Sequence, residues 1–236
     1  MNPFLIIYNE ILWRPLFNGL VFFYNTLPGS DLGLSIIALT ITIRTLLIPL
    51  MYKAQKAQRD LAIIQPKIKQ LQEKHKDDRE AQGKALMALY AEHKVNPFSG
   101  CLVTLIQLPV LIALFQVFRN GFDVSLLSYL YHFVNNPGAL NPISFGVLNL
   151  SKGNIYLGII ASLTQYFQIK LTMPPDASSP RAGDFSHAMR IQSMYVFPLL
   201  ILLWSYSLPS ALTLYWTVVN IFGIVQEVIV KKKRAG

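Results

Sequence analysis

The sequence predicts an all-α integral membrane protein with five transmembrane helices, and three observations lead to that prediction. The 236 residues are 53% hydrophobic and only 14% charged, with a mean hydropathy of +0.39, whereas a soluble domain carries about 25% charged residues. Five apolar stretches have lengths near the ~20 residues that cross a bilayer as a helix. The Lys and Arg residues gather in segments that one side of such a membrane would hold.

The N-terminal segment, residues 1–31, is predicted to form an external amphipathic helix that lies in the membrane interface. Its apolar stretch carries Arg14, Asn18 and Asn25, which fall near one helical face. Large apolar and aromatic side chains occupy the opposite face, a pattern typical of a helix lying along the membrane surface. The segment has no basic start and no small-residue cleavage site, so we do not interpret it as a cleavable signal peptide.

The rest of the chain alternates between apolar spans and polar connections. The predicted spans are 32–52, 97–118, 154–173, 190–207 and 208–230, the last preceded by a short external turn. The predicted connections are a cytoplasmic helical hairpin at 53–96, an external loop at 119–153, a cytoplasmic linker at 174–189 and a basic cytoplasmic tail at 231–236. Ser30 or Asp31 can cap the helix of the first span.

The hairpin prediction depends on an abrupt change of composition after the first span. Residues 53–96 are rich in Lys, Gln, Ala and Glu, with a polar break at 76–79, and the residue before Pro97 resists a helical conformation. Apolar residues recur three or four positions apart: Ala57, Leu61, Ile64, Ile68, Leu71, Leu86 and Leu89. We expect this short apolar seam in a helical hairpin that stands in water.

The distribution of basic residues sets the predicted topology. Seventeen Lys or Arg residues lie in or next to the hairpin, the linker and the tail, whereas the opposite side holds Arg14, Arg119 and Lys152. The side with more Lys and Arg is cytoplasmic in membrane proteins. The N-terminus is therefore predicted to be outside and the C-terminus in the cytoplasm.

Arg44 is the most informative residue, because it lies inside the first span, twelve residues after Leu32 and eight before Tyr52. An arginine near the centre of a span costs about 2.5–3.5 kcal/mol on insertion scales. The spans hold few acids: Glu227 lies near the inner end of the fifth and Asp31 at the outer end of the first. We prefer a wet cavity between the helices, and a structural ion pair with a buried carboxylate stays the alternative.

Polar and aromatic side chains on the spans support the same cavity. The candidate polar groups on the spans are Thr40, Gln107, Thr164, Gln165, Gln168, Thr217 and Asn220. Each of them alone is more often a hydrogen-bonding contact between helices. Tyr215 and Trp216 could line the cavity or form an ordinary aromatic belt at the membrane surface.

The basic hairpin and tail together account for +8 of the net charge of +9. The tail residues are Lys231, Lys232, Lys233 and Arg234. Composition alone favours a topology signal that also attracts anionic lipids. The alternative is docking to a polyanion such as ribosomal RNA, which salt would weaken.

Several chemistries are not expected. One cysteine, Cys101, leaves no internal disulfide, and the four histidines lack the spacing of metal ligands. No glycine-rich phosphate-binding motif is present. We therefore expect no metal, no cofactor, no nucleotide hydrolysis and no catalytic residues.

Several segments, taken in order, resemble the YidC-type membrane protein insertases of the cytochrome-oxidase-assembly superfamily, in a short form without the large external domain. The matching segments are TIRTLLIPLMYKAQ around Arg44, IQPKIKQLQ, MALYAEHKVNPFSGCLVTLIQLP, FPLL and LPSALTLYW. The resemblance covers about residues 31–230, and the order and spacing of the segments carry it.

The resemblance implies a hydrophilic groove, enclosed by five helices and open to the cytoplasm and the lipid, in a bacterial inner membrane. In this family the intramembrane arginine matches Arg44, and the aromatic residue that faces the groove matches Trp216 or its neighbour Tyr215. The hairpin would receive clients and the basic tail would help to dock ribosomes. Nascent membrane proteins, the ribosome and anionic lipids are the implied partners, and a protein-conducting translocon is a further candidate.

The leading functional hypothesis is therefore an insertase that needs no covalent chemistry. A groove open halfway into the bilayer would shorten the apolar path for a polar client segment, and burial of the client's apolar surface would drive release into lipid. A small-solute transporter with an arginine-lined cavity is the alternative, although paired half-sequences are missing. An intramembrane enzyme would need a nucleophile–base pair or paired acids at depth, and the spans show neither.

Overall fold

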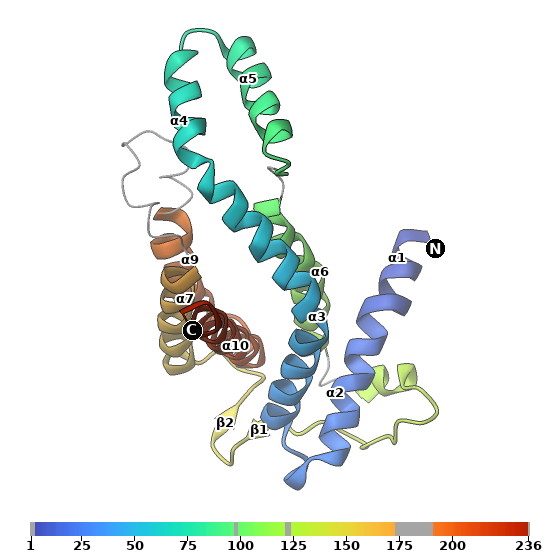
Figure 1. Ribbon diagram of the computed structural model, residues 1–236. Coiled ribbons are helices and arrows are strands. Elements are labelled where there is room, and N and C mark those ends of the chain that lie inside the picture. Colours follow the sequence, from blue (N-terminus) through green and yellow to red (C-terminus); the bar gives the residue numbers. More distant parts are fainter. Residues whose placement is uncertain (1–2, 97–98, 121–123, 173–190, 236) are drawn as a thin grey trace. The chain divides into compact units, whose positions relative to one another are not determined.

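The computed structural model describes residues 3–96, 99–120, 124–172 and 191–235, and it is mostly helical (Figure 1). The helices, in chain order, are α1 (Pro3–Tyr8), η1 (Asn9–Trp13), α2 (Arg14–Thr26), η2 (Pro28–Ser30), α3 (Leu32–Ile63), α4 (Gln65–Lys74), α5 (Arg79–Glu92), α6 (Ser99–Asn120), η3 (Val124–Tyr129), α7 (Ile155–Thr172), η5 (Gln192–Val196), α9 (Phe197–Trp204) and α10 (Ser210–Ala235). Two short antiparallel strands, β1 (Ile143–Ser144) and β2 (Leu148–Asn149), pair Ile143 with Asn149 and Ser144 with Leu148. The helical class is thereby confirmed.

Two helices in the described part of the chain are long and apolar enough to cross a membrane. They are Leu32–Leu61, within α3, and Ser210–Lys232, within α10. Gln107–Arg119 and Gln192–Trp204 are apolar but shorter. The count of five spans therefore stays a prediction, and α3 and α10 are the two described helices with the length and composition to cross a membrane.

The chain divides into two compact units. The first contains Met1–Leu46, Pro109–Met173 and Ser179–Gly236, and the second contains Leu47–Leu108 and Pro174–Ser178. Both α3 and α6 therefore contribute residues to each unit.

Two helices run further than the predicted spans. Helix α3 continues past residue 52 to Ile63, and α10 includes the basic residues at 231–234 that were predicted as a separate tail. A change in hydropathy marks a change of solvent, whereas a helix ends at a cap or at a residue that cannot continue it. The first such residue after Lys53 is Pro66, so α3 continues until the residues just before it.

The N-terminal helix packs into the core of the first unit. The backbone is helical from Pro3 to Thr26, with one π-helical turn at η1. Leu16, Phe17 and Leu20 of α2 are buried with apolar residues of α3, α6 and α10. Phe17 is fully buried, and burying such a side chain contributes about 1.5–3 kcal/mol.

Helix α7 lies between α9 and α10, and small residues allow the close approach. A Cβ atom at Gly158 would overlap the Ser205 hydroxyl. The Ser162 hydroxyl donates to the Pro198 carbonyl at 2.8 Å, which ties α7 to α9. Small residues and hydroxyl groups at helix contacts are typical of membrane helices, whose backbones approach closely.

The second unit contains the helical hairpin. Helices α4 and α5 pack through a cluster formed by Ile64, Ile68 and Leu89, and Leu61, Leu71, Leu86, Tyr90 and Val95 border it. Asp78 caps α5, because its Oδ1 accepts from the amides of Glu80 and Ala81 at 3.0 Å. These contacts fit the apolar spacing and the polar break on which the hairpin prediction depends.

Candidate functional site

Arg44 is buried on α3, one turn after Thr40. The two side chains are 6% and 2% exposed, and the Thr40 hydroxyl donates to the Ile36 carbonyl of its own helix at 2.6 Å. The phenol of Tyr215, on α10, is close enough to the Arg44 guanidinium to interact with it electrostatically. The first unit thus brings together the arginine and one of the two aromatic residues singled out from the sequence.

Helix α10 buries polar side chains on two faces: Thr213, Thr217 and Asn220 share one face, and Tyr215 lies on the opposite one. Thr213, Tyr215, Thr217 and Asn220 are all at most 5% exposed. The Thr217 hydroxyl donates to the Thr213 carbonyl at 2.9 Å, so it satisfies itself within the helix. The Asn220 amide carries two N–H donors and an acceptor oxygen, so one hydrogen bond within its own helix would not satisfy it.

Asn220 finds hydrogen-bond partners on α7. Its Nδ2 lies 3.2 Å from the Ala161 carbonyl and 3.3 Å from the Thr164 hydroxyl. Its buried Oδ1 has no hydrogen-bond partner among the described residues. A buried acceptor of this kind costs about 1–3 kcal/mol unless another group reaches it.

The two glutamines predicted on α7 lie near the same contact. Gln165 is buried, whereas Gln168 is half-buried. The Gln168 amide lies over Gly223 of α10, where an added Cβ would come within 2.5 Å of Nε2. Gln165 and Gln168 belong to the first unit, as Arg44 and Tyr215 do.

The two neighbouring aromatic residues have different surroundings. Tyr215 is buried and near Arg44, as described above, whereas Trp216 is half-buried and meets Phe197 of α9 edge to face, with ring centroids 5.8 Å apart. Tyr215 is thus the better candidate for a residue that acts with the arginine. Gln107, also predicted for the site, is half-buried and belongs to the second unit.

Lys231 makes contacts inside the chain. Its Nζ donates to the Leu171 carbonyl near the end of α7 at 2.6 Å and lies 3.9 Å from the buried carboxylate of Glu227. An ammonium at the C-terminal end of a helix is favourable, because carbonyl groups there lack partners. Lys232 is exposed, and the side chains of Lys233 and Arg234 lie outside the described residues.

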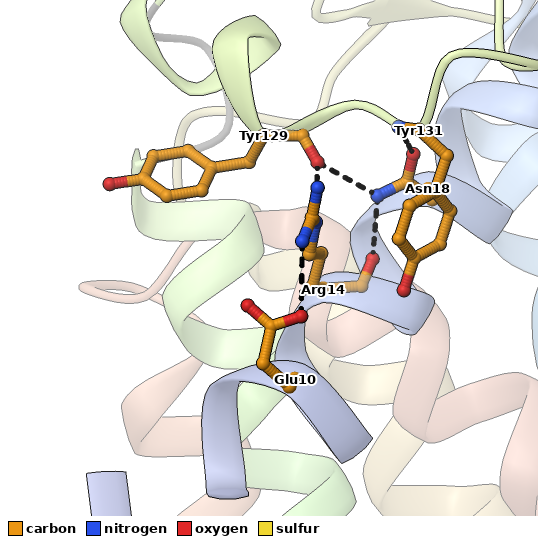
Figure 2. A network of polar contacts seen from close by, with 5 residues as sticks. All are labelled: Glu10, Arg14, Asn18, Tyr129 and Tyr131. Atoms are coloured by element: carbon orange, nitrogen blue, oxygen red, sulfur yellow. Dashed lines mark hydrogen bonds and ion pairs between the residues drawn. The ribbon is translucent and has the colours of Figure 1, made fainter. Parts of the chain in front are cut away.

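A polar network not expected from the sequence holds the external loop to α2 (Figure 2). Arg14 Nε donates to the Tyr129 carbonyl at 3.0 Å, and its Nη1 forms an ion pair with Glu10 at 3.0 Å. Asn18 donates to the same Tyr129 carbonyl at 3.2 Å and accepts from the Tyr131 amide at 2.6 Å. The polar face of the N-terminal helix therefore binds the loop backbone.

A second network fixes the strand hairpin to the start of α3. The Asp31 carboxylate caps α3 through the Leu34 amide at 3.0 Å and accepts from the Phe145 amide at 2.6 Å and from the Ser144 hydroxyl. Burial raises the pKa of Asp31, but these hydrogen bonds outweigh it and hold the pKa below its usual value. The cap was expected from the sequence, whereas the contacts with the loop were not.

The described residues contain no group of three or more His, Cys, Asp or Glu side chains placed to hold a metal ion. The geometry offers a buried arginine of α3 near the phenol of Tyr215 on α10, and a separate contact in which the Asn220 amide of α10 bonds to α7. Fold and site together define a class: helical membrane proteins with buried polar groups.

Comparison with known proteins assigns the family. The model of the 60Kd inner membrane protein family matches residues 22–235. The chain is 33% identical over 218 residues to the membrane protein insertase YidC of Fusobacterium nucleatum, covering 92% of this chain and 95% of that protein. It is 34% identical over 228 residues to the YidC of Alkalihalophilus pseudofirmus, covering 93% and 80%.

A solved structure agrees with these matches. A crystal structure described as an active YidC insertase with the first transmembrane domain resolved superposes with a TM-score of 0.57 at 27% identity, covering 94% of this chain and 46% of that chain. This chain belongs to the YidC family of membrane protein insertases, which confirms the resemblance seen in its sequence.

Proposed function

We propose that this protein receives hydrophobic segments of nascent membrane proteins in a polar groove and releases them into the lipid, without hydrolysing a nucleotide. The observation that carries the proposal is Arg44, which is 6% exposed on a helix long and apolar enough to span the membrane. An arginine at that depth needs water or polar neighbours. Tyr215 of α10, which is 3% exposed, is one such polar neighbour.

In the proposed mechanism, the groove lowers the cost of moving a client's polar tail. A charged or polar tail crosses less hydrocarbon when part of its path is hydrated, and Arg44 attracts acidic tail residues. The client's apolar segment then moves into the lipid, and burial of its surface drives the step at roughly 25 cal/mol per Å². The proposed groove residues of the first unit are Arg44, Thr40, Gln165, Gln168, Tyr215 and Trp216, and Gln107 of the second unit stays a prediction from the sequence.

The proposed topology has five spans, with the N-terminus outside and the C-terminus in the cytoplasm. Hydrogen bonds support the placement of the connections at one end of the first unit. The Ser210 amide, at the start of α10, donates to the Lys152 carbonyl at 2.9 Å, and the Asn154 amide, before α7, donates to the Ser205 carbonyl at 2.9 Å. The Asp31 contacts add the start of α3 to that end.

We propose the ribosome, anionic lipids and a protein-conducting translocon as further partners. The contacts of Lys231 within the chain leave Lys232, Lys233 and Arg234 as the tail residues for a polyanionic partner. Their contribution would be electrostatic and would weaken with salt.

The test is insertion of a small single-span client into liposomes that contain only this protein, scored by protease protection of the client. Arg44→Lys should retain much of the activity, because a point charge is enough to hydrate the groove. Arg44→Ala should impair clients with acidic external tails more than clients with neutral tails. Thr45→Val, at an exposed position next to Arg44, is the matched control and should insert both clients normally.

Thermal unfolding in detergent separates this proposal from a purely structural role of Arg44. If the arginine is held for an ion pair, Arg44→Ala leaves a buried charge unpaired and costs about 3–5 kcal/mol. Lysine would also be a poor substitute wherever a bidentate geometry is needed. A large loss of stability, with acidic and neutral clients equally affected, would refute the groove-charge mechanism.

A further inference from the structure

The external loop has an unusual composition for a segment expected in water. From Val124 to Ser151 it contains no Asp, Glu, Lys or Arg, although 14% of the chain is charged. Large apolar side chains are nevertheless exposed there: Val124, Tyr129, Phe133, Ile143, Phe145 and Val147. Phe133 is 67% exposed and Val147 is 88% exposed. Large apolar side chains exposed together in one segment indicate a contact with another phase or partner.

The loop is fixed, so it cannot fold these side chains inward. Arg14 and Asn18 hold the Tyr129 carbonyl, and Asp31 holds the Phe145 amide. Between these points the Asn25 amide donates to the Asn135 carbonyl at 2.6 Å. The apolar side chains therefore face outward because α2 and α3 bind the loop backbone.

The fixed position lies at the level where the long apolar helices begin. The strand hairpin is bonded to the first turn of α3, since the Gly33 amide donates to the Ser144 hydroxyl at 2.8 Å. The Leu150 carbonyl accepts from the Ala211 amide, in the first turn of α10, at 3.0 Å. Figure 1 shows β1 and β2 beside the start of α3. The loop is thus bonded to the first turns of both long apolar helices.

The loop also satisfies many of its own backbone groups. The amides of Gly138, Ile143 and Ser151 each donate to an asparagine side chain two residues earlier, at 2.9–3.0 Å. Such turns lower the cost of placing a backbone where water is scarce. Asp123 and Lys152 bound the charge-free stretch in the sequence, and the exposed basic residues Arg119 and Lys152 can reach lipid phosphates.

We propose that the segment Val124–Leu150 lies in the lipid interface at the end of the membrane where α3 and α10 begin, with Phe133 and Val147 in contact with acyl chains. Aromatic residues concentrate at this depth, and an interfacial segment is buried about 5–10 Å into the headgroup region. The lipid, and not a protein partner, is the occupant because the segment carries no Asp, Glu, Lys or Arg, exposes aromatic side chains and is bonded to the starts of both long apolar helices. The inference rests on the proposed membrane crossing of α3 and α10.

The test uses single cysteines labelled with the environment-sensitive fluorophore NBD in a Cys101→Ser background, after reconstitution into phosphatidylcholine–phosphatidylglycerol vesicles that contain no other protein. Phe133→Cys and Val147→Cys are the test positions. Ile221→Cys, exposed on α10, is the lipid reference, and Lys84→Cys, exposed on α5, is the water reference. Emission maxima and quenching by aqueous iodide are measured.

Both test positions should resemble Ile221→Cys, with blue-shifted emission and weak iodide quenching. If either is quenched as strongly as Lys84→Cys, the proposal is overturned, and a protein partner would then be the better explanation of the apolar surface. If Ile221→Cys itself reads as water-exposed, the crossing by α10 is wrong and the interfacial position falls with it. The references thus distinguish failure of this proposal from failure of the membrane-spanning fold.

Discussion

Replacing Asp31 by alanine tests whether the start of α3 and the external loop stabilise each other. The wild-type carboxylate accepts three hydrogen bonds: from the Leu34 amide at 3.0 Å, from the Phe145 amide at 2.6 Å and from the Ser144 hydroxyl. Alanine removes both acceptor oxygens and with them all three hydrogen bonds. The helix loses its cap, and the strand hairpin loses its bond to α3.

The expected loss of stability can be worked from these contacts. Loss of a helix N-cap costs about 1 kcal/mol. A hydrogen bond to a charged group contributes about 1.5–3 kcal/mol, and because Asp31 is only half-buried the lower end applies. Loss of the cap and loss of the bond from the Phe145 amide together give an expected decrease in the free energy of unfolding of roughly 2–3 kcal/mol for Asp31→Ala.

Unfolding in detergent micelles, followed by circular dichroism against denaturant, measures this loss. Asp31→Asn keeps one oxygen acceptor and should lose less than Asp31→Ala. In a double-mutant cycle with Ser144→Ala, the coupling energy should be at least about 0.5 kcal/mol, since the two side chains touch. A loss below about 0.5 kcal/mol for Asp31→Ala, or strict additivity with Ser144→Ala, would refute the reasoning.

Asp31, Gly83 and Lys231 each allow a further test. The hydrogen bonds to Asp31 lower its pKa in the folded state. Its contribution to the free energy of unfolding is therefore complete above the unfolded-state pKa of about 3.9 and is lost as the pH falls through the lower folded-state pKa. The unfolding midpoint of wild type should drop on acidification below about pH 4, and that of Asp31→Asn should drop less. An added Cβ at Gly83, within α5, meets no atom within 4 Å, so Gly83→Ala should stabilise the hairpin by about 0.5–1 kcal/mol, measured as increased amide hydrogen-exchange protection of α5; unchanged protection would contradict this. Lys231→Met should lower stability, because it removes the donor to α7 and the cation near Glu227. Replacing 232–234 by glutamine should instead leave stability unchanged and weaken ribosome binding at low salt. Thermal unfolding and co-sedimentation with ribosomes, measured for both variants, distinguish the two roles.

The signal behind the hairpin prediction is local. Ile64, Ile68 and Leu89 recur at helical spacing, and the structure buries all three. Arg44 was also accessible to sequence reasoning, since a charge within an apolar stretch stands out without knowledge of its neighbours. Such features depend on residues within a few turns of one another.

Contacts between distant segments carried no comparable signal. Asn18 looked like part of a polar helix face, but its partners are the backbone groups of Tyr129 and Tyr131, more than a hundred residues away. Nearly every residue carries such carbonyl and amide groups, so the residue types in the loop give no signal for these contacts. Lys231 was grouped with a basic tail for the same reason: its acceptor is the backbone carbonyl of Leu171.

The charge-free stretch of the external loop also limits how this protein's faces can be mapped by chemistry. Trypsin cleaves after Lys and Arg, and amine-reactive labels need Lys, so between Arg119 and Lys152 neither reagent has a target. The hairpin, by contrast, offers ten such residues between 53 and 96. Tryptic resistance of the loop is thus a property of its composition. A map of the two membrane faces made with these reagents would show the hairpin in detail and this loop only at its two ends.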